Sequence, residues 1–322
     1  GTSALQLAYP SADIRDGDAA IMPSHSFVAT ANSAAVMGIR PEFVDISPNH
    51  YNIDASKITR ALSPGVRALV IVHQVGAAAD MASLIKEASR HRLEVIEDAA
   101  CSLGATYKGR QTGSFGKVSC LSFHPRKIIT TGEGGMLLTN SEEAASVARK
   151  LRNHGLSQRS KSAPFTCESL GFNCRMTDIQ AAIGIVQFKK LPEILKLRRR
   201  IAERYAEAIG KLPALRLPVW PKDSTTNYQS FVVEVVDDGI NRNQLIRYMN
   251  EKGIEAKTGI QPIHTEPAYG RHDLDSYLTE TLRAARRSFF LPLYPGMTDE
   301  EQSLVMQALG EALDNSTKRR DG

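Results

Sequence analysis

Short, continuous apolar runs alternate with helical patterns over the first 150 residues of this chain, and few folds accommodate that alternation. The runs at 67–73 (RALVIVH) and 93–98 (LEVIED) have the length and composition of strands that are buried on both faces. Two more strand patterns lie at 19–23 and 41–46. Because helical patterns separate these runs, we expect parallel strands and an α/β fold with a mostly parallel sheet.

Helices are predicted wherever apolar residues recur at helical spacing. In the first half they lie at 27–38, 54–62 and 80–92. Two strands, 117–124 and 134–140, then follow each other without a helix between them. Beyond them the chain becomes helical, at 141–155, 177–191 and 192–212. Pro192 suits the first position of a helix, so the last two ranges are expected to be separate helices.

The segment 212–227 contains three prolines and is predicted to be a linker. After it come a strand pattern at 228–236 and helical patterns at 242–253 and 298–313. We therefore expect two domains, a large one over 1–211 and a small α+β domain over 212–322.

Composition excludes several classes of protein. The chain is 42% hydrophobic and 23% charged, and no run approaches the ~18 apolar residues of a membrane span. A net charge of +5 spread along 322 residues predicts no nucleic-acid groove. The four cysteines lack metal-ligand spacing and are interpreted as reduced thiols of a cytoplasmic protein: Cys101, Cys120, Cys167 and Cys174.

Polar residues cluster at the predicted carboxyl ends of strands, where open α/β sheets bind ligands. Asp98 ends one strand, Ser122 and His124 close the strand predicted at 117–124, and Lys127 follows soon after. Residues 1–3 would open a helix, whose free N–H groups suit a phosphate. A lysine, an aspartate and a phosphate cradle match the needs of pyridoxal 5'-phosphate, which takes a Schiff-base lysine and a carboxylate beside its ring nitrogen. The alternatives are a surface lysine, a helix-capping aspartate and a plain turn at TGEGG.

The order of several motifs is informative. They are GTSAL, MPSHSFVATANS, PEFVDI, YNID, VHQVGAAADM, VIEDAACSLGATYKGRQTGSFGKVSCLSFHPRKIITTGEGGMLLTN, LGFNCRMTDIQAAIGIVQ and LPLYPGMTDEEQ. Together they resemble the DegT/StrS family of pyridoxal-phosphate-dependent sugar aminotransferases, over essentially the whole chain. The resemblance implies the aspartate-aminotransferase-like fold (fold type I) and a homodimer with shared active sites.

The resemblance also implies roles for individual residues. Lys127 matches the Schiff-base lysine, Asp98 the partner of the ring nitrogen, and Phe27 an aromatic residue stacked on the ring. Phosphate contacts are implied for four residues, Thr2, Ser3, Ser122 and, across the dimer interface, Asn173. The alternatives are a core position for Phe27 and a helix cap for Asn173.

Two departures from the family pattern stand out. Cys101 occupies a position where family members commonly carry a glutamine that meets the cofactor, and a thiol is a poor hydrogen bonder. The family also has a substantial stretch before its counterpart of residues 1–3, which leads us to expect that the sequence is a fragment.

The function implied by the resemblance is transfer of an amino group, with L-glutamate as donor, to a nucleotide-linked keto-sugar. His264 and Tyr269, in GIQPIHTEPAY, match a segment that approaches the nucleotide-sugar, although an ordinary surface histidine is the alternative. Three other functions remain to be weighed: a sugar dehydratase of the same family, which carries histidine in place of the lysine; a non-catalytic regulatory or binding protein; and an NTPase built on TGEGG, which lacks the G-x-x-x-x-G-K-[ST] loop.

Overall fold

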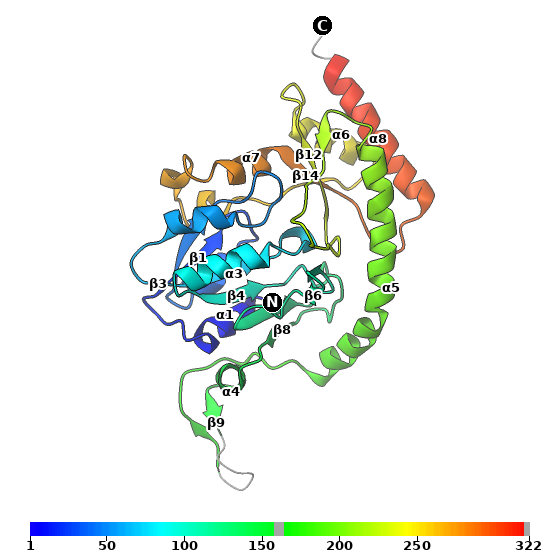
Figure 1. Ribbon diagram of the computed structural model, residues 1–322. Helices are drawn as coiled ribbons and strands as arrows, with labels where there is room; N and C mark the ends of the chain where they lie inside the picture. The colour runs from blue at the N-terminus through cyan, green and yellow to red at the C-terminus, as the bar shows by residue number, and fades with distance from the viewer. Residues whose placement is uncertain (158–163, 319–322) are drawn as a thin grey trace.

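The computed structural model describes residues 1–157 and 164–318, and its first half is built around a six-stranded sheet (Figure 1). The sheet has the order β2-β1-β3-β4-β7-β8. Its strands are β1 (Ala19–Pro23), β2 (Arg40–Val44), β3 (Val66–Val72), β4 (Glu94–Asp98), β7 (Val118–Ser122) and β8 (Gly135–Leu138). All neighbours pair in parallel except β7 and β8, which are antiparallel. The predicted α/β class with a mostly parallel sheet is therefore confirmed.

Both faces of this sheet are covered, which explains the apolar runs. Along β1, Ala20 and Met22 pack into one core cluster, whereas Ile21 between them packs into another. This alternation is the two-residue period of a strand with a core on each side. On the first face lie α1 (Thr2–Ser11), α2 (Ala29–Ala35) and α4 (Glu142–Leu151). On the second lie the 3₁₀ helix η1 (Ala55–Ala61) and α3 (Met81–Arg90).

The helix expected at 54–62 is thus a short 3₁₀ helix. Its first turn is fixed by Asp54, whose carboxylate accepts hydrogen bonds from both the backbone N–H and the hydroxyl of Ser56. Such local side-chain bonds favour a tight turn over a regular α-helix.

The prediction of two helices on either side of Pro192 is wrong, because α5 is one helix, Asp178–Ile209. It begins with a capping box, in which Thr177 and Gln180 satisfy each other's backbone N–H groups. Pro192 is exposed, while Leu191 and Leu195 pack in the same apolar cluster as Ile128 and Ile129. The free energy gained from this apolar packing exceeds the cost of the one backbone hydrogen bond that proline removes from the helix. Figure 1 shows α5 as a long, bent helix along one side of the molecule.

A second, antiparallel sheet lies beside the upper half of α5 (Figure 1). Its order is β11-β12-β14-β13, and the strands are β11 (Leu215–Arg216), β12 (Phe231–Val235), β13 (Lys257–Thr258) and β14 (Ser288–Leu291). The helices α6 (Arg242–Glu251) and α8 (Asp299–Lys318) pack on it. The predicted linker therefore contains a strand, β11. This core also includes Tyr205 of α5, so the predicted domain boundary after residue 211 stays a prediction.

The remaining elements are short connections. They include two antiparallel pairs of strands, each strand two residues long: β5 (Thr106–Tyr107) with β6 (Arg110–Gln111), and β9 (Leu156–Ser157) with β10 (Thr166–Cys167). The segment between the last two strands of the small sheet returns to the large sheet through Ile263 and Leu278, and it ends in α7 (Thr279–Arg287). Among the described helices, none is both long and apolar enough to cross a membrane.

Candidate active site

Three neighbouring strands of the large sheet end side by side, and several predicted site residues lie at or just beyond their ends. Asp98, the last residue of β4, is in register with Val72 at the end of β3 and with Cys120 near the end of β7. Ser122 ends β7, and Lys127 lies on the loop that leads from β7 to β8. Parallel strands thus bring Asp98, Ser122 and Lys127 to one edge of the sheet, as predicted.

Asp98 is buried, with 5% of its surface exposed, and is held by neutral donors. One carboxylate oxygen accepts a hydrogen bond from the hydroxyl of Thr30 at 2.8 Å, and the other accepts one from the backbone N–H of Ala100 at 3.2 Å. The Thr30 hydroxyl is in turn 2.9 Å from that of Ser26. These donors orient the carboxylate without neutralising it, so its charge is available to a cationic group such as a protonated ring nitrogen.

Thr30 was not among the predicted site residues. It lies three residues after Phe27, on the buried side of α2. The sequence offered only one signal for it, a threonine on the inner face of a helix that follows a strand end.

Lys127 is partly buried on a turn, where its N–H bonds the carbonyl of His124 at 2.9 Å. Its Nζ donates to the sulfur of Cys101 at a distance of 3.0 Å. Burial opposes the ammonium form, but the Cys101 sulfur and the Asp98 carboxylate favour it, and together they raise the pKa of Lys127. The lysine is therefore a site residue with defined partners and not a freely solvated surface charge.

The start of α1 is shaped to receive an anion. Its N-cap, Gly1, makes no side-chain capping bond, and Thr2 and Ser3 are exposed. The end of β7 approaches closely: a Cβ placed on Gly1 would lie 2.8 Å from the Cβ of Ser122, so only glycine fits without a shift. Uncapped N–H groups and three hydroxyls at the positive end of a helix dipole suit a phosphate.

Phe27 is exposed, with 68% of its surface accessible, although it lies between the buried residues of β1 and α2. The alternative that it is a core phenylalanine is therefore wrong. An exposed aromatic ring next to Ser26, which contacts the hydroxyl that holds Asp98, is a suitable surface for a flat heterocycle. The anion cradle, the buried carboxylate, the lysine and this ring together fit pyridoxal phosphate.

Asn173 lies in the segment before α5. It is exposed, and it forms an isolated bridge with Asn153. The alternative that it caps α5 is wrong, because the N-cap of that helix is Thr177.

His264 is buried, and both ring nitrogens have partners, the Ser24 hydroxyl at 2.6 Å and the Asp275 carboxylate at 3.1 Å. An ordinary surface histidine is thereby excluded. The Tyr269 hydroxyl donates to Asn32 of α2 at 2.6 Å. A direct contact of His264 or Tyr269 with a substrate stays a prediction.

A second buried carboxylate, Glu97, supports the site from the next position along β4. It accepts hydrogen bonds from the backbone N–H groups of Gly113, Phe115 and Gly116, from His73 and from the Ser119 hydroxyl. Burial opposes its ionisation, but these donors prevail and lower the pKa of Glu97 to about 2. Glu97 therefore holds the 113–116 turn against β4 and β7 and fixes the strand that carries Asp98.

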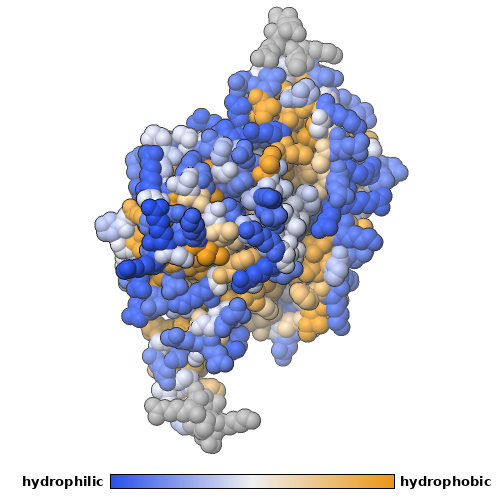
Figure 2. Space-filling view, in the orientation of Figure 1, coloured by the Kyte–Doolittle hydropathy of each residue, from blue (hydrophilic) through white to orange (hydrophobic). Residues whose placement is uncertain are grey.

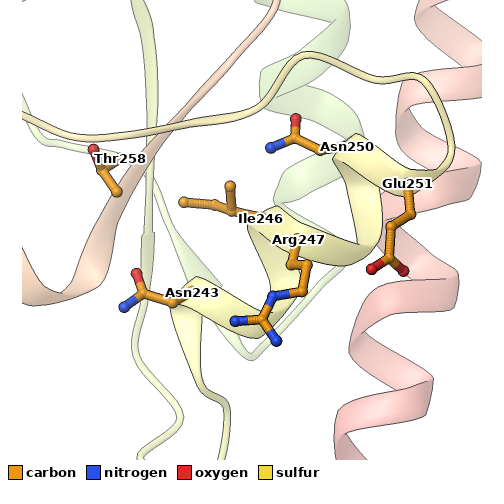
Figure 3. Close-up of a pocket in the computed structure, with 6 residues that line it drawn as sticks. All are labelled: Asn243, Ile246, Arg247, Asn250, Glu251 and Thr258. Carbon is orange, nitrogen blue, oxygen red and sulfur yellow. The ribbon is translucent and has the colours of Figure 1, made fainter.

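A hollow on the described surface lies between α6 and β13 (Figure 3). It has a volume of about 540 Å³, and it is lined by Asn243, Ile246, Arg247, Asn250 and Glu251 of α6 and by Thr258 of β13. None of the predicted site residues lines it. In the part of the chain that the structure describes, no group of three or more histidine, cysteine, aspartate or glutamate residues is arranged to hold a metal ion.

Comparison with known proteins agrees with this geometry. The profile of the DegT/DnrJ/EryC1/StrS aminotransferase family matches residues 1–310. GDP-perosamine synthase of Caulobacter vibrioides is 36% identical over 97% of this chain and 84% of its own length. The dTDP-4-dehydro-2,3,6-trideoxy-D-glucose 4-aminotransferase of Saccharopolyspora spinosa is 32% identical over 99% and 84%.

A solved structure shows the same fold. The aminotransferase TlmJ of Streptoalloteichus hindustanus superposes with a TM-score of 0.90 and 31% identity, over 98% of this chain and 84% of TlmJ. The fold is accordingly that of the fold type I enzymes, and the cofactor is pyridoxal phosphate. The chain belongs to the DegT/DnrJ/EryC1/StrS aminotransferase family and is a pyridoxal-phosphate-dependent aminotransferase.

Proposed function

We propose that this aminotransferase moves the amino group of L-glutamate to a nucleotide-linked keto-sugar, for the synthesis of amino-sugars in the cytoplasm. Support comes from the names of two relatives, of which one is a GDP-sugar synthase and the other acts on a dTDP-linked dehydro-sugar. The observation that carries the chemistry is the position of Lys127 and Asp98 at one sheet edge, beside an uncapped helix start.

Each group of the site has a proposed task. Thr2, Ser3 and Ser122, with the N–H groups of α1, hold the phosphate. Asp98 holds a proton on the ring nitrogen, and Phe27 supports the ring. When bound, pyridoxal phosphate supplies an aldehyde that receives the amino group and a ring that withdraws electrons from the adjacent carbon.

Lys127 has two proposed tasks. Its Nζ anchors the cofactor before the amino donor arrives, and it then carries a proton between the donor's α-carbon and the cofactor. An arginine could not do this, because it does not readily lose its proton. Lysine at this position also argues against the dehydratase alternative, whose members carry histidine there.

We also propose a homodimer in which Asn173 reaches the phosphate of the other subunit. The support is an apolar surface on the first half of α5, where Ile179, Ile183, Val186 and Phe188 are all exposed. Figure 2 shows apolar residues at the surface along the side where α5 lies. Several large apolar side chains exposed on one helix are typical of an interaction site.

Replacement of Lys127 tests the function. Wild-type protein loaded with pyridoxal phosphate should absorb in the visible, and L-glutamate should bleach that absorbance and release 2-oxoglutarate. Lys127→Ala should lose the absorbance and slow amination of dTDP- or GDP-linked keto-sugars by at least a factor of about 1,000, as measured by mass spectrometry. Lys211→Ala, at an exposed helix end, is the matched control. Normal turnover by Lys127→Ala would refute the assignment.

A further inference from the structure

Cys101 and Lys127 are 26 residues apart in sequence, yet the Lys127 Nζ and the Cys101 Sγ are only 3.0 Å apart. We propose that this pair is a redox modification site, in which peroxide converts the contact into a covalent nitrogen–sulfur bond between the two side chains. The bond would remove the amine that the transaminase needs, and thiols would restore it.

The surroundings hold the two groups together. The side-chain amide of Asn227 donates to the carbonyl of Cys101 at 2.8 Å and to that of Leu103 at 3.0 Å, which fixes the loop after β4. On the other side, the Gln229 amide hydrogen-bonds the carbonyl of Arg126, the residue before Lys127. Both loops are thus anchored on the same short segment of the small domain, so the sulfur and the amine meet without a large movement.

Cys120 and Cys167, two of the other three cysteines, lack this arrangement. Cys120 is fully buried, and burial raises its pKa, which suppresses the reactive thiolate. The Cys167 thiol is exposed, and it donates to the carbonyls of His154 and Ser169. Cys101 is partly exposed, which favours the approach of a small peroxide, and the Lys127 amine lies next to its sulfur.

The chemistry balances in two steps. First, the Cys101 thiolate attacks one oxygen of hydrogen peroxide, the O–O bond breaks, and the departing hydroxide takes a proton from the Lys127 ammonium to give water. This leaves a sulfenic acid beside a neutral amine. Second, the Lys127 Nζ attacks the sulfur, the S–O bond breaks, and the departing hydroxide takes a proton from Nζ. Sulfur is oxidised by two electrons, peroxide is reduced to two waters, and condensation of a sulfenic acid with nitrogen is established cysteine chemistry.

Thiols can reverse the formation of the N–S bond. A small thiol attacks the sulfur, the N–S bond breaks, and Nζ regains its proton as a free amine. A second thiol then releases Cys101 from the mixed disulfide. The regulatory consequence rests on the proposed role of Lys127. Cofactor attached to the lysine would prevent formation of the N–S bond, whereas peroxide would inactivate the cofactor-free enzyme.

Peptide mass spectrometry tests the proposal. Cofactor-free protein is treated with hydrogen peroxide, its remaining thiols are blocked with iodoacetamide, and it is digested. We expect joined peptides that contain Cys101 and Lys127, with a mass lower by two hydrogen atoms than the sum of the free peptides. Dithiothreitol should separate them. Cys101→Ser and Lys127→Ala should each lower the yield by more than about tenfold, whereas Cys167→Ser should leave it unchanged.

Two further measurements distinguish a failure of the proposed N–S bond from a failure of the proposed cofactor role of Lys127. In Lys127→Ala, the sulfenic acid should persist and react with dimedone. If wild-type Cys101 reacts with dimedone as fully as the variant does and no joined peptide forms, the proposal is overturned. Prior loading with pyridoxal phosphate should suppress the joined peptide. If the peptide forms equally with and without loading, the modification stands and the cofactor role of Lys127 fails instead.

Discussion

At the scale of single residues, the site depends on how the Asp98 carboxylate is held. Asp98 is buried, and yet its hydrogen bonds come from a hydroxyl and an amide, both neutral. A buried carboxylate is costly unless positive charge lies near it, and Lys127 is a cation whose ammonium form Asp98 favours. In the role proposed for Asp98, the protonated ring nitrogen of pyridoxal phosphate would place a further positive charge beside this carboxylate.

Asp98→Asn tests that explanation. The amide keeps the size of the side chain but loses the negative charge, so the ring nitrogen loses its proton and withdraws electrons poorly. We expect the cofactor still to attach to Lys127, with its visible absorbance retained, while the half-reaction with glutamate slows by a factor of about 100 or more in stopped-flow measurements. Thr30→Ser, which keeps the hydroxyl donor, is the control. An undiminished half-reaction would mean that Asp98 has only a structural role.

At the scale of elements, Glu97 links β4, β7 and the 113–116 turn around the six-stranded sheet. Its pKa is lowered from 4.5 to about 2, so its ionised form contributes stability that is complete above pH ~4.5 and is lost as the pH falls toward 2. That difference corresponds to about 3 kcal/mol.

Glu97→Gln should therefore destabilise the protein by about 3 kcal/mol at pH 7, because an amide N–H₂ would face backbone N–H donors. The free energy of unfolding of the variant should also fall less than that of the wild type between pH 5 and pH 2. Glu94→Gln, on the same strand but 41% exposed at its side chain, should change little at either pH. Equal pH dependence in wild type and Glu97→Gln would contradict this account. Urea unfolding at each pH provides the measurement.

The elements also show where prediction from sequence succeeds and where it stops. The apolar runs predict the positions of β1, β3 and β4, because a strand that is buried on both faces is apolar at nearly every position. The strand ends then predicted the grouping of Asp98 and Lys127. Local signals failed at Pro192, where tertiary packing along α5 overrides a helix-start preference. The contacts of Thr30 and of Cys101 join residues distant in sequence, and no local pattern encodes such pairs.

At the scale of the whole molecule, the exposed apolar side chains on α5 are unfavourable in contact with water. Ile179, Ile183 and Val186 recur at helical spacing and remain exposed, which is the pattern of a helix face that packs against a partner. Phe165 and Phe172, in the segment just before α5, are exposed as well, and Asn173 follows directly. A second copy of the chain on this surface would bury these residues and carry Asn173 toward a site.

If Asn173 does complete the site of the other subunit, two defective variants should restore each other. In a heterodimer of Lys127→Ala with Asn173→Ala, one site receives both defects and the other receives neither. After full subunit exchange, about half of the dimers are mixed and each has one native site, so activity should approach about a quarter of the wild-type value, above the mean of the parents.

The matched control for this mixture is Lys127→Ala with Asp98→Asn. Both of these residues come from the same chain's site, so every site in the mixed dimer carries one defect and no activity should return. Native mass spectrometry would verify the exchange, and Asn173→Ala alone must first be shown to be impaired. If mixed dimers form and activity stays at the mean of the parents, Asn173 acts within its own chain. The apolar surface on α5 would then have to be explained without a shared active site.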